Sequence, residues 1–281
     1  HGYPNLVTRT HAELDLVDGA AVARFFAEQQ PQVVFIAAAK VGGILANNTY
    51  PANFIRENLA IQTNLIHEAY RAGVKKLVFL GSSCIYPRDC PQPIREDYLL
   101  TGPLEPTNRP YAIAKIAGIE MCWSYNRQYG TQYLCAMPTN LYGPGDNYDL
   151  ATSHVVPALI RKVHAAKAGG ADVAVWGSGT PRREFLHVDD CADACVHLLR
   201  TWSGPGHVNV GVGEDVTIAE LAAMIVEVAG SESRVVFDPA KPDGAPRKLL
   251  DVAKLAALGW RASIPLREGL ARTYAEYAAQ N

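Results

Sequence analysis

A tyrosine and a lysine four positions apart form the first pair in this sequence whose types and spacing could do chemistry. Tyr111 and Lys115 stand in a YxxxK pattern inside a segment of helical periodicity, where residues i and i+4 share one face. An ammonium group beside a phenol favours the phenolate and lowers the phenol's pKa from about 10. Such a tyrosine can pass a proton to a carbonyl oxygen while a hydride arrives at the carbon. The same spacing also fits a solvent-exposed pair without function, because a chain with 13 tyrosines produces chance matches.

Small polar residues at the ends of apolar runs give that pair its context. Ser82 and Ser83 follow one such run, and Thr139 and Asn140 follow another. In an open parallel sheet, ligands bind at the carboxyl ends of the strands, so a serine there can hydrogen-bond a substrate oxygen beside the tyrosine. Such residues also form ordinary turns. Their occurrence together with the YxxxK pair favours a functional site.

Short apolar runs alternate in the first half of the chain with longer segments of helical periodicity. Strands that are buried on both faces and separated by helices are typical of a parallel, doubly wound sheet. We expect strands at 33–37, 76–80 and 133–137, and helices at 53–70 and 111–129. Farther along we expect helices at 153–166 and 218–228, and short strands at 173–176, 207–210 and 234–237.

These elements predict an α/β protein with a Rossmann-type, doubly wound parallel sheet and a smaller C-terminal α/β substrate domain. The dinucleotide-binding domain is expected to cover 1–148, with 184–204 threaded back into it, and the substrate domain 149–183 and 205–281. A dinucleotide-binding sheet normally opens with a strand, a Gly-rich turn and a helix. Here the sequence begins directly before an apparent second strand at 9–16, so the sheet is expected to lack its first strand, turn and helix.

The composition is that of an ordinary globular enzyme. The 281 residues are 48% hydrophobic and 19% charged, and the formal net charge of −2 favours neither a nucleic-acid partner nor a membrane surface. No apolar run is long enough to span a bilayer. The six cysteines lack the paired spacing of a metal site, so we expect no bound metal and a reducing, cytoplasmic compartment.

Six runs, spread over nearly the whole chain, closely resemble the family of GDP-L-fucose synthases, which are extended short-chain dehydrogenases/reductases. They are AAAKVGGILANNTYP, GSSCIYP, LEPTNRPYAIAKIAG, PTNLYGPGDNYD, VWGSGTPRREFLHVDD and KPDGAPRKLLD. The resemblance implies conversion of GDP-4-keto-6-deoxy-D-mannose to GDP-L-fucose, by epimerisation of two sugar carbons and reduction of the ketone with NADPH. Two alternatives stay open: an enzyme like GDP-L-colitose synthase, and a nucleotide-sugar-binding fragment without catalysis.

The resemblance also implies the catalytic residues. Ser82, Tyr111 and Lys115 would form the reductase triad, with Tyr111 as the proton donor to the C4 oxygen. Cys84 and His154 would be the acid and base of epimerisation. Two such groups suit the chemistry, because the C4 ketone acidifies C3 and C5, and cysteine and histidine side chains as classes titrate near neutrality.

By the same resemblance, NADP(H) would lie along the carboxyl edge of the sheet. His11 stands where the family usually has an arginine near the ribose 2′-phosphate. An imidazole is a weaker phosphate partner than a guanidinium, which leaves the choice between NADPH and NADH open. The implied cofactor-binding residues are His11, Asp15, Leu16, Ala37, Ala38, Ala39, Leu80, Gly81, Ser82, Ser83, Lys115, Pro138, Thr139, Asn140, Leu141 and His154.

The GDP-sugar would contact aromatic and charged residues of the C-terminal half. The implied substrate-binding residues are Lys162, Trp176, Arg183, Asp243 and Lys248. The family further implies a homodimer packed through the helices at 53–70 and 111–129. Because the Gly-rich turn is not in the sequence, we expect the chain as given to bind the GDP-sugar but to bind NADPH poorly or not at all.

Overall fold

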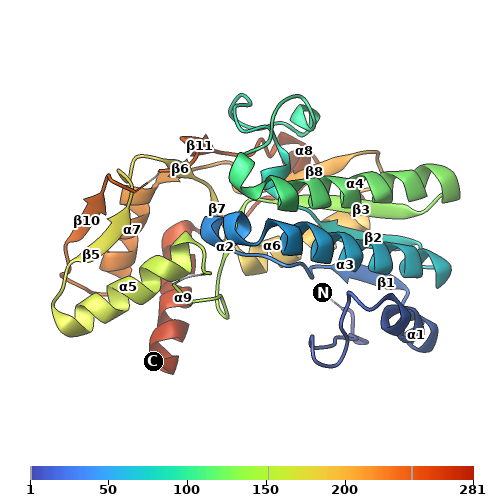
Figure 1. Ribbon diagram of the computed structural model, residues 1–281, viewed down its shortest axis with the longest axis horizontal. Helices are drawn as coiled ribbons and strands as arrows, with labels where there is room; N and C mark the ends of the chain where they lie inside the picture. Colours follow the sequence, from blue (N-terminus) through green and yellow to red (C-terminus); the bar gives the residue numbers. More distant parts are fainter. Residues whose placement is uncertain (1, 151, 242) are drawn as a thin grey trace.

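The computed structural model describes residues 2–150, 152–241 and 243–281 and shows an elongated molecule made of two parts (Figure 1). The larger part contains a parallel sheet flanked by long helices, and the smaller part gathers β5, β10, α5, α7 and α9 at the other end (Figure 1). No helix among these described residues is both long and apolar enough to cross a membrane.

The main sheet has four parallel strands in the order β1-β2-β3-β8. Side chains alternate between its two faces, and both faces are buried, which is why the strands read as continuous apolar runs. The predicted parallel, doubly wound sheet is therefore confirmed. Its strands are β1 (Val33–Ile36), β2 (Lys76–Leu80), β3 (Gln132–Pro138) and β8 (His207–Val210).

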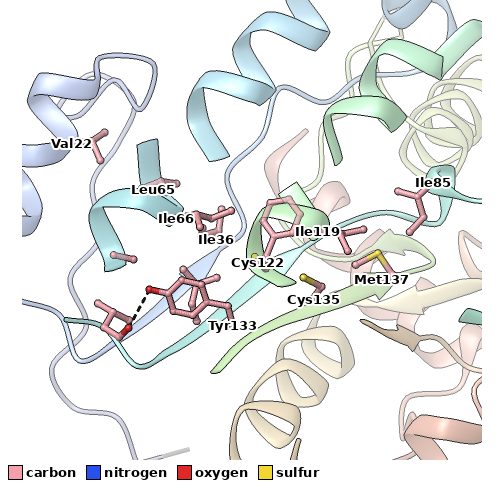
Figure 2. Packing of buried hydrophobic residues seen from close by; sticks show 14 of the residues in the cluster. Val22, Ile36, Leu65, Ile66, Ile85, Ile119, Cys122, Tyr133, Cys135 and Met137 are labelled. Carbon is pink, nitrogen blue, oxygen red and sulfur yellow. Dashed lines mark hydrogen bonds between the residues drawn. The ribbon is translucent and has the colours of Figure 1, made fainter. Parts of the chain in front are cut away.

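Helices cover both faces of this sheet. The apolar sides of α1 (Gly19–Gln29), α3 (Pro51–Arg71) and α4 (Arg109–Tyr129) pack with one set of strand residues. The other set packs with α6 (Val188–Thr201) and α8 (Ala253–Ala257). Figure 2 shows the first of these cores, in which the Tyr133 hydroxyl donates a hydrogen bond to the Val74 carbonyl oxygen (3.1 Å).

The smaller part is built on a two-stranded parallel sheet of β5 (Val173–Trp176) and β10 (Val235–Asp238). Three helices pack together around a second core there: α5 (Val155–Gly169), α7 (Ile218–Val228) and α9 (Leu266–Gln280). Helix α7 begins with a capping box, in which Thr217 and Glu220 satisfy each other's backbone N–H groups.

Short strands lie where the two parts meet. A parallel pair joins β4 (Asn140–Tyr142) to β7 (Phe185–His187), and a three-stranded set joins β11 (Arg247–Lys248), β6 (Arg182–Arg183) and β9 (Val216–Thr217). The remaining short helices are α2 (Ile44–Thr49), η1 (Ser83–Ile85), η2 (Glu96–Tyr98) and η3 (Pro106–Asn108).

Two expectations about individual elements were wrong. The strand at His207–Val210, assigned from sequence to the substrate domain, pairs with β3 in the main sheet. All four of its residues are buried, and their pairing partner lies some 70 positions earlier, where local pattern gives no information. The division of the chain at 205 must therefore move past this strand, while the rest of the domain division stays a prediction.

The second wrong expectation concerns 9–16, which form turns and not a strand. The Glu13 carboxylate accepts hydrogen bonds from the backbone N–H (2.7 Å) and hydroxyl (2.9 Å) of Thr10. The backbone N–H groups of Glu13 and Leu14 both donate to the Thr10 carbonyl oxygen. This local network closes a turn, and it competes with the extended conformation that was expected for this segment.

A buried carboxylate forms hydrogen bonds to several chain segments where the two parts of the molecule meet. Glu184 is fully buried, and its carboxylate accepts hydrogen bonds from the backbone N–H groups of Val212 (2.6 Å), Gly213 (2.8 Å) and Leu250 (3.0 Å). Burial raises the pKa of Glu184, and these backbone donors oppose that rise. The side chain thus ties three segments that are distant in sequence.

We expect Glu184→Ala to lower the free energy of unfolding by about 3 kcal/mol or more, because three backbone N–H donors lose a fully buried acceptor. The measurement is urea denaturation followed by circular dichroism. Glu28→Ala on the exposed side of α1 is the matched control and should unfold with the wild-type midpoint. Equal midpoints for the two variants would show that Glu184 does not hold these segments together.

Candidate active site

The carboxyl end of β2 passes through a glycine into a short helical turn that presents two reactive side chains. A Cβ on Gly81 would lie 2.3 Å from the Met137 sulfur, so a larger residue there would require the Met137 side chain to move. Ser82 then caps η1, with its Oγ accepting a hydrogen bond from the Cys84 backbone N–H (3.3 Å). The turn therefore places Ser82 and Cys84 side by side at the sheet edge.

Tyr111 reaches this edge from the first turn of α4. Burial raises the pKa of Tyr111 well above its usual value, a charge on Cys84 would raise it further, and a hydrogen bond with the Ser82 side chain lowers it. The structure thus joins Ser82 to Tyr111, as the sequence suggested. It contradicts the expected low pKa of the phenol, because burial has the largest effect on that pKa and raises it.

Lys115 lies one turn farther along α4 and is buried. Its Nζ donates a hydrogen bond to the Leu80 carbonyl oxygen (2.8 Å) and lies 5.9 Å from the centre of the Tyr111 ring. Burial lowers the pKa of Lys115 to about 8. The ammonium is held by a strand-end carbonyl and not by the phenol, which explains why it does not bring the phenol's pKa down. A protonated phenol suits a proton donor.

The Cys84 thiol is half-buried and has two polar neighbours. The Asn108 Nδ2 donates to its sulfur at 3.3 Å, and the Lys248 Nζ lies 3.7 Å from it. Lys248 was expected to bind the GDP-sugar. The structure places its ammonium at the cysteine that the sequence assigned to epimerisation.

Strand pairing explains why the Lys248 and Arg183 side chains lie on the same face of β11 and β6. In the parallel register, Lys248 pairs with Arg183 and Arg247 pairs with Arg182. The Asp215 carboxylate binds the guanidinium groups of both Arg182 and Arg247. Because side chains alternate along strands, Arg183 and Lys248 point to the opposite face. Burial lowers the pKa of Arg183, and the charge of Asp243 opposes this.

His154 is exposed and stands at the N-cap of α5. The loop before it reaches the glycines ahead of α2, where the Gly43 N–H donates to the Thr152 carbonyl oxygen (3.2 Å). Helix α2 in turn packs against η3, which carries Asn108. These contacts link the loop before His154, through α2, to the segment that carries Asn108.

Two residues near the predicted catalytic pair were missed from the sequence. Asp146 has its pKa raised by burial, while the Asn147 backbone N–H and the nearby His154 lower it. Asn108 contacts the Cys84 sulfur. Asp146 lies in the run PTNLYGPGDNYD, and Asn108 lies in the run LEPTNRPYAIAKIAG. The sequence could have pointed to them only through their closeness in the chain to predicted catalytic residues.

The predicted cofactor residues fall into two groups. Leu80, Gly81, Ser83 and 138–141 lie at the carboxyl ends of β2 and β3, and 37–39 follow β1. Two of these side chains are already engaged, since Thr139 Oγ1 (3.3 Å) and Asn140 Nδ2 (2.8 Å) both donate to the Glu184 carbonyl oxygen.

The residues predicted at the adenosine lie on the turns before α1. His11 and Asp15 are exposed, with the His11 Nδ1 4.0 Å from an Asp15 carboxylate oxygen. Asp15 also accepts a hydrogen bond from the Val17 backbone N–H (2.9 Å). Leu16 is half-buried against the core beneath α1 and α3, so its side chain has a packing role of its own.

The predicted substrate residues of the smaller part cluster around the end of β5. Trp176 is 61% exposed, with the Lys241 Nζ 5.5 Å from the centre of its ring. Lys162 on α5 donates to the Ala174 carbonyl oxygen (2.9 Å) of β5. Asp243 accepts hydrogen bonds from the backbone N–H (2.6 Å) and hydroxyl (2.8 Å) of Ser178. An open aromatic face thus stands beside several charged groups. No cluster of three or more His, Cys, Asp or Glu side chains that could hold a metal occurs in the described ranges.

A Rossmann-type sheet whose carboxyl edge carries this serine, tyrosine and lysine defines a short-chain dehydrogenase/reductase. The family model described as "NAD dependent epimerase/dehydratase family" matches residues 3–211. The chain belongs to that family and groups within it with the GDP-L-fucose synthases.

Individual relatives give the same picture. The chain is 61% identical to "Putative GDP-L-fucose synthase 2" of Arabidopsis thaliana (98% of this chain, 84% of the relative) and 58% identical to "GDP-L-fucose synthase" of Escherichia coli K12 (97% and 88%). Identity to a GDP-L-colitose synthase of Yersinia pseudotuberculosis is lower, 39% (95% and 88%). The structure of a GDP-L-fucose synthetase from Naegleria fowleri bound to NADP is similar, with TM-score 0.91 and 29% identity over 98% of this chain and 84% of that one.

Proposed function

We propose that this protein catalyses the NADPH-dependent 3,5-epimerisation and 4-keto reduction of GDP-4-keto-6-deoxy-D-mannose, giving GDP-L-fucose. One observation carries the proposal: a single turn after β2 presents Ser82 beside the Tyr111 hydroxyl and the Cys84 thiol two positions on. Groups for carbonyl reduction and for proton exchange at carbon therefore share one site. The high identity to curated GDP-L-fucose synthases supports the choice of substrate.

Epimerisation needs a base and an acid at carbons next to the ketone. The Cys84 thiolate takes a proton from such a carbon, which leaves an enolate whose charge lies on the C4 oxygen. A proton returned from His154 to the other face completes the inversion. The Lys248 ammonium, 3.7 Å from the sulfur, strengthens its contact when the sulfur is charged. Asp146 is placed to orient the imidazole, since the two interact electrostatically.

Reduction uses the triad at the same edge. Tyr111 donates its proton to the C4 oxygen as the carbonyl becomes a hydroxyl, and Ser82 holds that oxygen. When bound, the nicotinamide group supplies the hydride. The residues present fit such a group. The buried Lys115 ammonium donates one of its three N–H groups to the Leu80 carbonyl oxygen, so the other two can donate to ribose hydroxyls.

NADP(H) is the cofactor that we propose, which agrees with the NADP named for the similar Naegleria structure. His11 would stand near the 2′-phosphate, where its exposed imidazole and its neighbour Asp15 set the choice between the two nicotinamide cofactors. For the GDP-sugar, Arg183 would neutralise the diphosphate, and the exposed Trp176 ring would stack on the base or sugar.

The test is product analysis. GDP-4-keto-6-deoxy-D-mannose and its 3-deoxy analogue are incubated separately with NADPH and a form of the protein that also carries the N-terminal strand and Gly-rich turn, and products are identified by proton NMR. The same form of the protein is used in every turnover assay. We expect GDP-L-fucose from the first and a much lower rate with the second. Preference for the analogue would assign a colitose-type activity, and binding of GDP-sugar without turnover would assign a binding role.

The remaining parts of the proposal concern assembly and location. We propose a homodimer packed through α3 and α4, which lie side by side on one face of the sheet (Figure 1). Sedimentation velocity should give twice the 30.4 kDa chain mass. We also propose a cytoplasmic setting, because all six cysteines are free thiols.

A further inference from the structure

Asn108 occupies a position where an asparagine normally serves the helix that follows. It is the N-cap residue of α4, and asparagine at an N-cap usually accepts a hydrogen bond from the backbone N–H two or three residues on. Here its side chain makes no capping hydrogen bond. The second helical residue is Pro110, which has no N–H to offer, so one of the usual capping partners is missing.

The Asn108 amide points at the Cys84 sulfur instead. Its Nδ2 donates to that sulfur at 3.3 Å. The Oδ1 atom of the same amide is buried and has no hydrogen-bond partner among the residues that the structure describes. A buried acceptor without a partner is unfavourable, and so is an uncapped helix start. Local stability is thus reduced at a side chain that contacts the thiol, and such a loss is typical of functional sites.

The backbone around Asn108 is fixed to the segment that follows Cys84. The Glu105 carboxylate caps η3 by accepting a hydrogen bond from the Thr107 N–H (3.3 Å), and it lies 3.5 Å from the Arg88 guanidinium. The Arg88 backbone N–H donates to the Pro103 carbonyl oxygen (2.9 Å). These interactions fix the segment that carries Asn108 relative to the segment that follows Cys84. The Asn108 amide itself has no second hydrogen bond among the described residues.

A half-turn of the amide about its last bond exchanges the positions of Nδ2 and Oδ1. In one orientation an N–H faces the sulfur, which suits a thiolate acceptor. In the other orientation the carbonyl oxygen faces it, which suits the S–H of a thiol. Because no other hydrogen bond in the described structure holds the amide, the half-turn exchanges an N–H···S bond for an S–H···O bond and breaks no further hydrogen bond.

We propose that Asn108 is the positioning residue of Cys84, donating its N–H to the thiolate and, after a half-turn, accepting the S–H of the thiol. This inference rests on the proposed function, in which Cys84 alternates between the two forms as protons leave and return at carbon. Asn108 does not contact the reacting carbon. It keeps the Cys84 sulfur in position both when the sulfur is a thiolate and when it is a thiol. Lys248, a cation without an acceptor atom, can serve the thiolate alone.

The test reads the thiol directly and needs no turnover. Iodoacetamide alkylation of Cys84 is followed against pH by peptide mass spectrometry, and trypsin separates Cys84 from Cys90 because it cleaves after Arg88. We expect Asn108→Ala to move the midpoint of the pH profile upward by about one pH unit, since a hydrogen bond to the charged form is lost. Asn108→Asp should move it by about one to two units, because a carboxylate cannot donate and adds a like charge.

Asn48→Ala, at an exposed asparagine of α2, is the matched control and should leave the profile unchanged. A residue with a merely structural role would change the melting temperature of the Asn108 variants and not the alkylation midpoint. Unchanged midpoints in both Asn108 variants would overturn the proposal, whether or not the protein turns over the GDP-sugar.

A second measurement links the contact to the reaction. Exchange of solvent deuterium into the sugar should fall about tenfold at neutral pH in Asn108→Ala, in step with the thiolate fraction. Oxidation of GDP-L-fucose by NADP⁺, which needs no proton exchange at C3 or C5, should keep its rate. Loss of that oxidation with exchange intact would overturn the proposal. Absence of both activities in the wild type would instead remove the proposed function, and the alkylation result would still decide the role of Asn108.

Discussion

Replacing Tyr111 by phenylalanine is expected to lower the rate of ketone reduction at least about a thousandfold while leaving proton exchange at C3 and C5 near its wild-type rate. The hydroxyl is the group placed beside Ser82, and its loss removes the proton donor to the C4 oxygen. The ring and its packing stay, so the fold should be unaffected. Cys84 and His154 approach from η1 and α5 and do not depend on this hydroxyl.

The measurement combines NADPH oxidation with NMR of deuterium entering the sugar from solvent. Tyr50→Phe removes a hydroxyl from an exposed tyrosine outside the site and serves as the control. If exchange disappears together with reduction in a folded Tyr111→Phe protein, one residue serves both steps and the division of roles is incorrect. Reduction at the control's rate would remove Tyr111 from the mechanism.

The elements that the sequence predicted well are those whose residue pattern is compatible with only one kind of secondary structure. The run at Lys76–Leu80 was predicted with the bounds it has, because a short apolar stretch ending in glycine can be buried on both faces of a sheet. The i,i+4 spacing likewise placed Tyr111 and Lys115 on one face of a helix. Both inferences depend on local periodicity alone.

What the sequence could not give depends on contacts between distant residues. Lys248 lies at the Cys84 sulfur although 164 positions separate them, and the sequence indicated only a role in binding the GDP-sugar. The raised pKa of Tyr111 depends mainly on its burial, which involves several segments of the chain. Asn108 would be expected to cap its helix, and the structure shows it turned to sulfur. In each case the competing partner comes from another segment of the chain.

The same distinction separates the two cysteines of the loop after β2. Cys84 and Cys90 are both half-buried, and both lie near Lys248, whose Nζ is 3.7 Å from the Cys84 sulfur. Burial raises the pKa of Cys90, and the lysine opposes that rise. The Cys84 sulfur has in addition the Asn108 amide at 3.3 Å and the Ser82–Tyr111 pair beside it. Sequence spacing makes the two thiols look alike, and their neighbours distinguish them.

Cys84→Ser is therefore expected to slow solvent exchange at C3 and C5 at least about a hundredfold, because a serine hydroxyl is a much poorer base than a thiolate. The hydroxyl oxygen can still accept from Asn108 and Lys248, so the free energy of unfolding should change by less than about 1 kcal/mol. Oxidation of GDP-L-fucose by NADP⁺ should persist, since it relies on Tyr111. Cys90→Ser is the control that keeps the loop and the lysine and should retain exchange. If Cys84→Ser exchanges solvent protons at the wild-type rate, this thiol has no catalytic role. If both reactions are lost while GDP binding is intact, the sulfur positions the sugar and does not transfer its protons.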